Sequence, residues 1–255
     1  MWKVCKYTLI DLARNRFMLV YTLLLLAISW GLFVLEGDAI KGLLALEQVV
    51  LALVPLIAVV FTVTYFHNLS DFTELLAVQP LRRRSILLGQ LLALGIAMLV
   101  ALVVGMYLPI AVFAPFDIGG VLMLCAALLT LSFVSIGALI AMKNRDKARA
   151  VGFGLAVWAV MVIVYDALLL WAMLAFGDRP IEPFVVPIAA LNPIDLARIM
   201  VMLKVDLAAM MGYSGAVYKQ YLGSVGGIMM ATGALMLWVI VPAWWSLRAF
   251  DRKDL

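Results

Sequence analysis

The chain has 255 residues, of which 67% are hydrophobic and only 13% carry a formal charge. This composition excludes an ordinary water-soluble domain, in which roughly a quarter of the residues are charged. The net charge of +4 comes from Lys and Arg at the edges of apolar stretches, without the aromatic-interleaved basic surface of nucleic-acid-binding proteins. We therefore expect no nucleic-acid partner and expect membrane lipids around the chain.

Six long apolar stretches dominate the sequence, and each reaches the roughly 20 residues needed to cross the hydrocarbon core of a bilayer. They run at 17–35, 46–67, 86–113, 121–142, 150–176 and 223–245. We therefore predict an all-α integral membrane protein with six transmembrane helices. Because these helices and their connections use nearly all of residues 1–255, we treat the chain as a single transmembrane domain.

Positive charge is concentrated in alternate gaps between the stretches. Of the 19 Lys and Arg residues, 14 lie in the two tails and in the second and fourth loops. Lys and Arg near helix ends are retained on the cytoplasmic side of the membrane. We therefore predict cytoplasmic N and C termini, which agrees with an even number of crossings.

The N-terminal segment, residues 1–16, has apolar and basic residues on opposite sides at helical spacing. This pattern is typical of a helix lying in the cytoplasmic interface, and it fits an extension of the first transmembrane helix equally well. The two cysteines, Cys5 and Cys125, are predicted to lie too far apart for a disulfide or a cysteine-based metal site.

The segment 177–222 is the largest predicted outer segment. Its first part is rich in Pro, and Asn192 followed by Pro193 then indicates a helix start with Asn as the cap. An amphipathic outer helix is predicted from there to about Gly212. The apolar face predicted to contact a periplasmic partner comprises Leu196, Ile199, Met200, Leu203 and Leu207. Its methionines suit either Cu(I) or ordinary apolar packing, and packing is the favoured interpretation because no fixed ligand set is present.

The cytoplasmic loop 68–85 lies between the second and third spans. A short helix is predicted from Ser70, stopped at Gln79 and Pro80. Apolar residues in this helix suit insertion into a groove on a soluble partner. Composition alone slightly favours an ordinary loop that only sets topology.

Motifs in and around this loop resemble those of the ABC-2-type permeases. They are Phe-Thr-Glu-Leu-Leu at 72–76, Gln-Pro-Leu-Arg-Arg at 79–83 and Leu-Leu-Gly-Gln at 87–90, together with Asn-Pro at 192–193 and the ending at 250–255. The sequence departs from the family pattern at Gln90, where Lys is common, and lacks a Gly within 74–80. The resemblance implies that the loop is a coupling loop contacting an ATPase subunit through Asp71, Phe72, Glu74, Leu75, Leu76, Pro80, Arg82 and Arg83.

Within that superfamily the chain is most similar to the NosY-type permeases of nitrous-oxide reductase maturation. The similar elements are Tyr165-Asp166 with the following Leu run, the segment 192–198 and the C-terminal ending. This resemblance implies a homodimer with two ATP-binding subunits, which hold ATP and magnesium, and a periplasmic protein partner that serves copper-site assembly.

The chain itself is predicted not to be an enzyme and to hold no cofactor or metal. A self-sufficient ATPase needs a phosphate loop ending in Gly-Lys-Ser or Gly-Lys-Thr, and no Lys in this sequence follows a Gly. ATP hydrolysis is therefore expected in a partner subunit. An intramembrane enzyme would need paired catalytic groups at membrane depth, for which the sequence offers only Asp166.

Asp166 is the acid that the sequence places well inside a predicted span. A charge there costs roughly 2.5–3.5 kcal/mol on insertion scales, so the side chain should face the bundle interior or be protonated. One interpretation is a polar point on the transport or force-transmission path. The favoured one is a neutral acid bonded to Tyr165, Ser132, Ser135 or a carbonyl, because a single acid without a basic partner is a poor proton relay. The alternative function is an ABC-2-type exporter of a hydrophobic drug, lipid or peptide.

Overall fold

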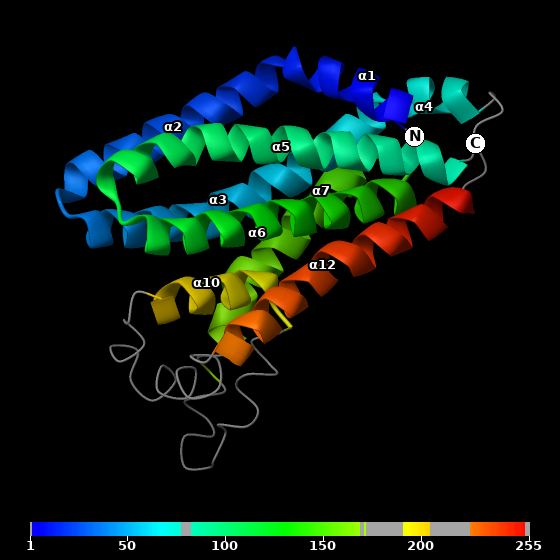
Figure 1. The fold of residues 1–255 in the computed structure, drawn as a ribbon. Coiled ribbons are helices and arrows are strands. Elements are labelled where there is room, and N and C mark those ends of the chain that lie inside the picture. The colour runs from blue at the N-terminus through cyan, green and yellow to red at the C-terminus, as the bar shows by residue number, and fades with distance from the viewer. Residues whose placement is uncertain (1, 78–82, 169–170, 172–190, 205–224, 253–255) are drawn as a thin grey trace.

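The computed structural model describes residues 2–77, 83–168, 171, 191–204 and 225–252, and these form helices (Figure 1). In chain order the helices are α1 (Trp2–Ala13), α2 (Arg16–Glu36), α3 (Ala39–Asn68), α4 (Ser70–Ala77), α5 (Arg83–Phe113), α6 (Phe116–Lys143), α7 (Lys147–Ala159), the π-helical η1 (Val160–Val164), α10 (Pro193–Lys204) and α12 (Val225–Asp251).

Six helices in the described part of the chain are long and apolar enough to cross a membrane, which confirms the predicted all-α class and number of spans. They are Arg16–Glu36, Ala39–Asn68, Arg84–Phe113, Asp117–Lys143, Lys147–Leu168 and Met229–Asp251. The fifth of these runs through α7 and η1 without a break in the helical path.

The apolar stretches 17–35 and 46–67 imply an outer loop at 36–45, and this prediction is wrong, because only Gly37 and Asp38 separate α2 from α3. Gly37 ends α2 in the left-handed conformation with φ 63°, which glycine adopts without a Cβ clash. The carboxylate of Asp38 then accepts hydrogen bonds from the amides of Ile40 and Lys41, and so caps α3. The same bonds lower the pKa of Asp38.

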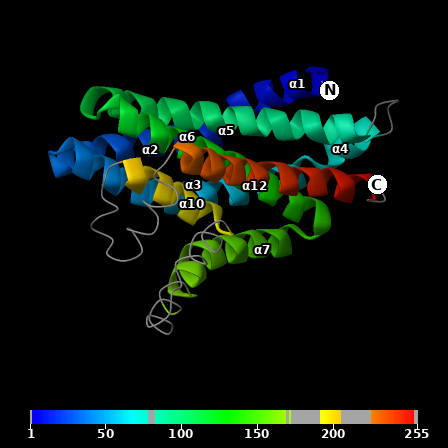
Figure 2. The same cartoon turned by 60° about the horizontal axis from the view of Figure 1, so that its bottom comes forward.

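The spanning helices pack side by side, and α6 lies at the centre, in contact with α3, α5 and α12. The helix α7 diverges from the other spans (Figure 2) and is held to α3 by the indole of Trp158, which donates to the carbonyl of Ala52 at 2.8 Å. One end of the bundle, called the α4 end here, gathers α1, α4, the start of α5 and the end of α12 (Figure 1). The α2–α3 and α5–α6 turns lie at the other end, called the α10 end.

The N-terminal segment is a helix separate from the first span. The chain breaks at Arg14 and Asn15, and the Asn15 side chain accepts a hydrogen bond from the Phe17 amide to start α2. The helix α1 packs on α5 through one buried side, and Tyr65 of α3 donates to the Asp11 carboxylate at 3.1 Å. Its position in the membrane interface stays a prediction.

Candidate functional site

The helix α4 begins at Ser70 and ends at Ala77, as the sequence predicts for the loop between the second and third spans. It is too short to be stable alone, so its position depends on tertiary contacts. Thr73 is buried, whereas Phe72 and Leu75 are 45% and 69% exposed. The helix therefore has one side fixed to the protein and two large apolar side chains on its open surface.

A buried hydrogen bond fixes α4 to the third span. The Gln90 amide of α5 is fully buried and donates to the Thr73 hydroxyl at 2.9 Å, and this hydroxyl donates to the carbonyl of Leu69. Gln90 is the position at which the sequence departs from the ABC-2 pattern. The bond joins α4 directly to a helix that runs the length of the bundle.

We expect Thr73→Val to lower the free energy of unfolding by about 1–3 kcal/mol, because it leaves the buried Gln90 amide without its acceptor at nearly constant volume. The measurement is the melting temperature of the purified protein in detergent. Thr73→Ser keeps the hydroxyl and should melt close to the wild type, and equal losses in both variants would show that the hydroxyl is not the important group.

The loop between α6 and α7 is tied to the same region. The His67 ring contacts the carbonyl oxygens of Val63 and Asn144 at 2.8 and 3.2 Å, and the Lys147 ammonium donates to the Asn68 side chain at 2.8 Å. The end of α3, the start of α4 and the start of α7 therefore form one connected surface.

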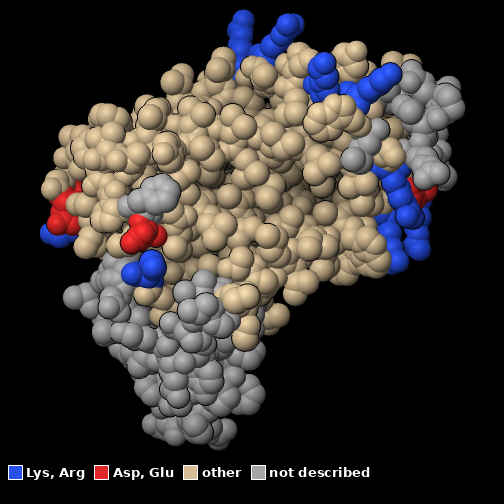
Figure 3. Space-filling view, in the orientation of Figure 1, with Lys and Arg blue, Asp and Glu red and all other residues tan. Residues whose placement is uncertain are grey.

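On the face shown in Figure 3, most basic side chains lie along the upper edge and at the α4 end, and a broad surface without charges separates them from the charged groups at the α10 end. Arg84 of α5 forms an ion pair with Asp251 near the end of α12. Arg248 lies over the ring of Trp244, with 3.5 Å between the guanidinium carbon and the ring centroid. An exposed ion pair such as Arg84–Asp251 contributes about 1 kcal/mol at most, so it shapes the surface more than it stabilises the fold.

The predicted coupling residues are only partly described. Phe72 and Leu75 are exposed on α4. The structure places four others within helices but does not describe their side chains: Asp71, Glu74, Leu76 and Arg83. Pro80 and Arg82 lie outside the described residues. Their contact with an ATPase subunit stays a prediction.

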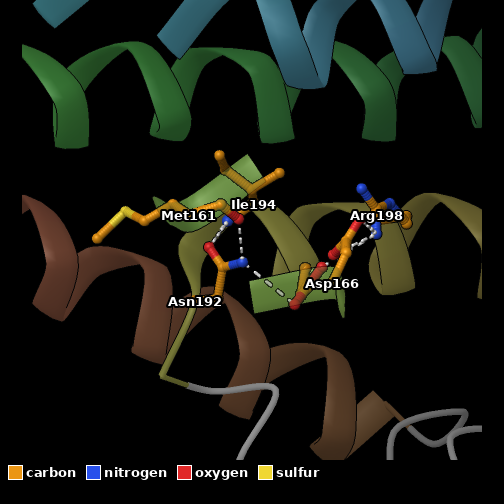
Figure 4. Close-up of polar contacts among 6 residues, drawn as sticks. Met161, Asp166, Asn192, Ile194 and Arg198 are labelled. Carbon is orange, nitrogen blue, oxygen red and sulfur yellow. Dashed lines mark hydrogen bonds and ion pairs between the residues drawn. The ribbon is translucent and has the colours of Figure 1, made fainter. Parts of the chain in front are cut away.

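A second polar site joins α10 to the fifth span (Figure 4). Asn192 is fully buried, and its side-chain oxygen accepts from the Ile194 amide, which confirms the predicted cap of α10. The same side chain donates to the Met161 carbonyl at 2.8 Å and to Asp195 at 3.1 Å. Because Met161 belongs to η1, one asparagine both starts α10 and holds the π-helical segment.

Arg198 is the basic partner that the sequence interpretation of Asp166 lacked. Its guanidinium donates to both Asp166 oxygens at 3.1 and 3.0 Å and to Asp195 at 3.1 Å. The Asp166 and Arg198 side chains point toward each other (Figure 4). Asp166 is 39% exposed, and the described contacts to it come from α10 and not from Ser132 or Ser135. The two residues lie 32 positions apart, so helical spacing gave no signal for the pair.

Asp195 lies outside the spanning segments, and its pKa is raised to about 7, first because the side chain is buried and next because the Asp166 charge is close. Arg198 and Asn192 act in the opposite direction. A carboxyl with a raised folded pKa favours the folded protein below its unfolded pKa of about 3.9, and this contribution is lost as the pH rises towards the folded value.

We therefore expect the melting temperature to fall as the pH is raised from about 5 to 7 and to level off above that range. Asp195→Asn should flatten this part of the profile, since the amide does not titrate. The comparison of the two melting profiles across the pH range is the measurement. Parallel profiles would contradict a titrating Asp195.

The apolar face assigned to a periplasmic partner is used inside the chain instead. Leu196, Ile199 and Met200 are at most 4% exposed, Leu203 packs on the core, and α10 contacts α6 and α12. Leu207 lies outside the described residues. The face is buried because α10 folds back against the spans, so Leu196, Ile199 and Met200 offer a partner no free surface. The burial of Met200 agrees with the packing interpretation of the methionines.

Sequence reasoning also missed Glu47. This acid lies in α3 within the second spanning helix and is 0% exposed. It lies near the start of the predicted stretch 46–67, directly after the segment 36–45, most of which is helical in the structure. Among the described residues no group of three or more His, Cys, Asp or Glu is arranged to hold a metal ion.

A bundle of apolar spanning helices, with a short helix fixed across one end, defines a multi-pass membrane protein. Residues 45–255 match the model of the ABC-2 family transporter proteins, and the chain belongs to this family. It is 27% identical over 266 residues to a protein of Stutzerimonas stutzeri called "Probable ABC transporter permease protein NosY", covering 95% of this chain and 92% of the relative. A protein of the same name from Pseudomonas aeruginosa is 27% identical over 232 residues, with 82% and 83% coverage.

The family defines several properties of this chain. It is a NosY-like permease subunit of an ABC transporter and a multi-pass protein of the prokaryotic inner membrane. Such permease subunits are typically not catalytic themselves and act with a separate ATP-binding subunit.

Proposed function

We propose that two copies of this permease pair, that each binds an ATP-binding subunit through the α4 region, and that ATP-driven motion passes through the bundle to the α10 end. ATP and magnesium belong to the partner subunit. The observation that carries the proposal is α4 itself, with Phe72 and Leu75 exposed and its other side bonded to Gln90 of α5.

The contacts of α4 explain how force on this helix would reach the spans. Thr73 links α4 to α5, whereas His67 and Lys147 link the end of α3 to the start of α7. A displacement of α4 would therefore act on three spans together. Packed helices transmit such displacements as rigid elements because their interiors have few voids.

We further propose, on the similarity to NosY permeases, that the moving segment is 177–222 and that it acts on a periplasmic protein in assembly of a metalloenzyme copper site. With the apolar face of α10 buried, the partner surface would be formed by other parts of this segment. This role makes the chain a transmitter of force and not a conduit.

The test of the α4 contact is coexpression with the ATP-binding subunit, using Phe72→Ala with Leu75→Ala. We expect the amount of copurified ATP-binding subunit to fall at least tenfold in the double variant. Truncating an apolar side chain at the centre of an interface costs about 2 kcal/mol of binding free energy. Leu35→Ala is the matched control, since Leu35 is 83% exposed at the α10 end. Undiminished copurification of the double variant would contradict the assigned contact.

One observation favours the alternative of an exporter for a hydrophobic drug, lipid or peptide. An apolar groove of about 560 Å³ lies between α6, η1 and α12, where Met161, Trp238 and Trp245 contribute to its lining. Stimulation of ATP hydrolysis by an apolar compound, without any periplasmic protein, would favour this exporter over the force transmitter.

A further inference from the structure

A buried carboxyl group and a buried guanidinium nitrogen remain without a hydrogen-bond partner near α10. Both carboxyl oxygens of Glu47 in α3 lack a partner among the described residues, and so does Nε of Arg198. Glu47 is 0% exposed, and the Arg198 charge acts on it electrostatically. The helices α3 and α10 are in contact.

An acid buried in this way is unfavourable, because water is lost and no donor replaces it. Arg198 already donates to two carboxylates through a single nitrogen, Nη1, and its Nε has no hydrogen-bond partner among the described residues. The guanidinium therefore has donor capacity for a further carboxylate. Among the described residues, Glu47 is an acid without a hydrogen-bond partner on which the Arg198 charge acts.

We propose that Arg198 exchanges between two ion pairs, one with Asp166 of the fifth span and one with Glu47 of the second span, as α10 shifts during the transport cycle. The inference rests on the proposed function, since it needs ATP-driven motion of α10. In the present structure Arg198 forms its ion pair with Asp166. In both states the guanidinium then has a second carboxylate partner besides Asp195.

The charged and polar groups around Arg198 and Glu47 belong either to α10, which moves in this proposal, or to the spanning helices, which do not. Asp195 and Asn192 are on α10 and travel with Arg198, whereas Tyr165 of the fifth span and Cys125 of α6 stay with the bundle. Because Asp195 keeps its bond to Arg198 within one helix, the exchange replaces Asp166 only. Glu47 and Asp166 are therefore the positioning residues for the two states of α10.

The test uses the complete complex with its ATP-binding subunit, either nucleotide-free or trapped with ATP and vanadate. Melting temperatures are measured for Glu47→Gln, Asp166→Asn and each combined with Arg198→Gln. In the nucleotide-free complex we expect Asp166→Asn to melt about 5 °C lower and Glu47→Gln to melt like the wild type. In the trapped complex we expect the reverse, so that Glu47→Gln melts lower and Asp166→Asn melts like the wild type. Each decrease in melting temperature should disappear when Arg198 is already replaced.

Glu36→Gln is the matched control, because Glu36 is an exposed acid at the same end of the bundle. A Glu47→Gln effect that is equal in both states, or absent from both, overturns the exchange. A second readout is disulfide formation between Glu47→Cys and Arg198→Cys in a Cys125→Ala background, expected only in the trapped state. A complex without ATP hydrolysis or vanadate trapping would instead contradict the proposed function, so the two failures are distinguishable.

Discussion

Arg198→Leu is expected to lower the free energy of unfolding by about 3 kcal/mol, near the lower end of the range for breaking a buried ion pair, since Asp166 is partly exposed. The change leaves Asp195 buried beside Asp166 with no cation between them. For a chain of this size such a loss corresponds to a melting temperature lower by roughly 6–12 °C. The measurement is thermal unfolding of the purified protein in detergent.

Two further variants separate the contribution of the cluster from the simple loss of a charge. Arg198→Lys keeps the charge but not the planar donors and should lie between the wild type and Arg198→Leu. Arg84→Leu breaks the exposed pair with Asp251 and should cost about 1 kcal/mol at most. If Arg198→Leu melts no lower than Arg84→Leu, the cluster does not hold α10.

Gly137→Leu is expected to have the other large effect, because this glycine lies where α6 crosses α3. A Cβ at this position would lie 2.8 Å from the Thr62 Cβ and 3.1 Å from the Val59 carbonyl oxygen. Small residues at such crossings allow helices to approach closely, and overpacking costs about 3 kcal/mol when the neighbours are rigid. We expect a lower yield of folded protein and a lower melting temperature.

Gly152→Leu is the matched control for Gly137→Leu. No atom lies within 4 Å of a Cβ built at Gly152 on α7, so the larger side chain meets open space. Removing a helical glycine is also favourable by about 1 kcal/mol. Equal losses in the two variants would mean that the α3–α6 crossing is not closely packed around Gly137.

The spans and the two short helices could be predicted from local sequence. Apolar runs of this length are typical of transmembrane helices and not of water-soluble domains, so all six spans follow from composition. The start of α10 at Pro193 follows from the Asn192 cap, and α4 follows from its position before Gln79 and Pro80. These signals are local because caps and hydrophobic runs depend on near neighbours in the chain.

Predictions that depended on distant contacts were less successful. Residues 36–45, with Glu36 and Asp38, were predicted to form a loop, but a left-handed glycine and an aspartate cap reduce the turn to two residues. The amphipathic pattern of α10 gave its apolar face correctly and did not tell whether a partner or the chain itself covers that face. The Arg198–Asp166 pair arises from folding α10 back onto the fifth span, which no spacing in the sequence encodes.

The most direct test of the account is isolation of the tagged chain from its native membrane in mild detergent, with the bound proteins identified. We predict that an ATP-binding subunit and a periplasmic protein copurify with the wild type, and that Phe72→Ala with Leu75→Ala removes the ATP-binding subunit. Recovery of the chain with no ATP-binding subunit would contradict the central claim that this permease transmits ATP-driven motion through α4.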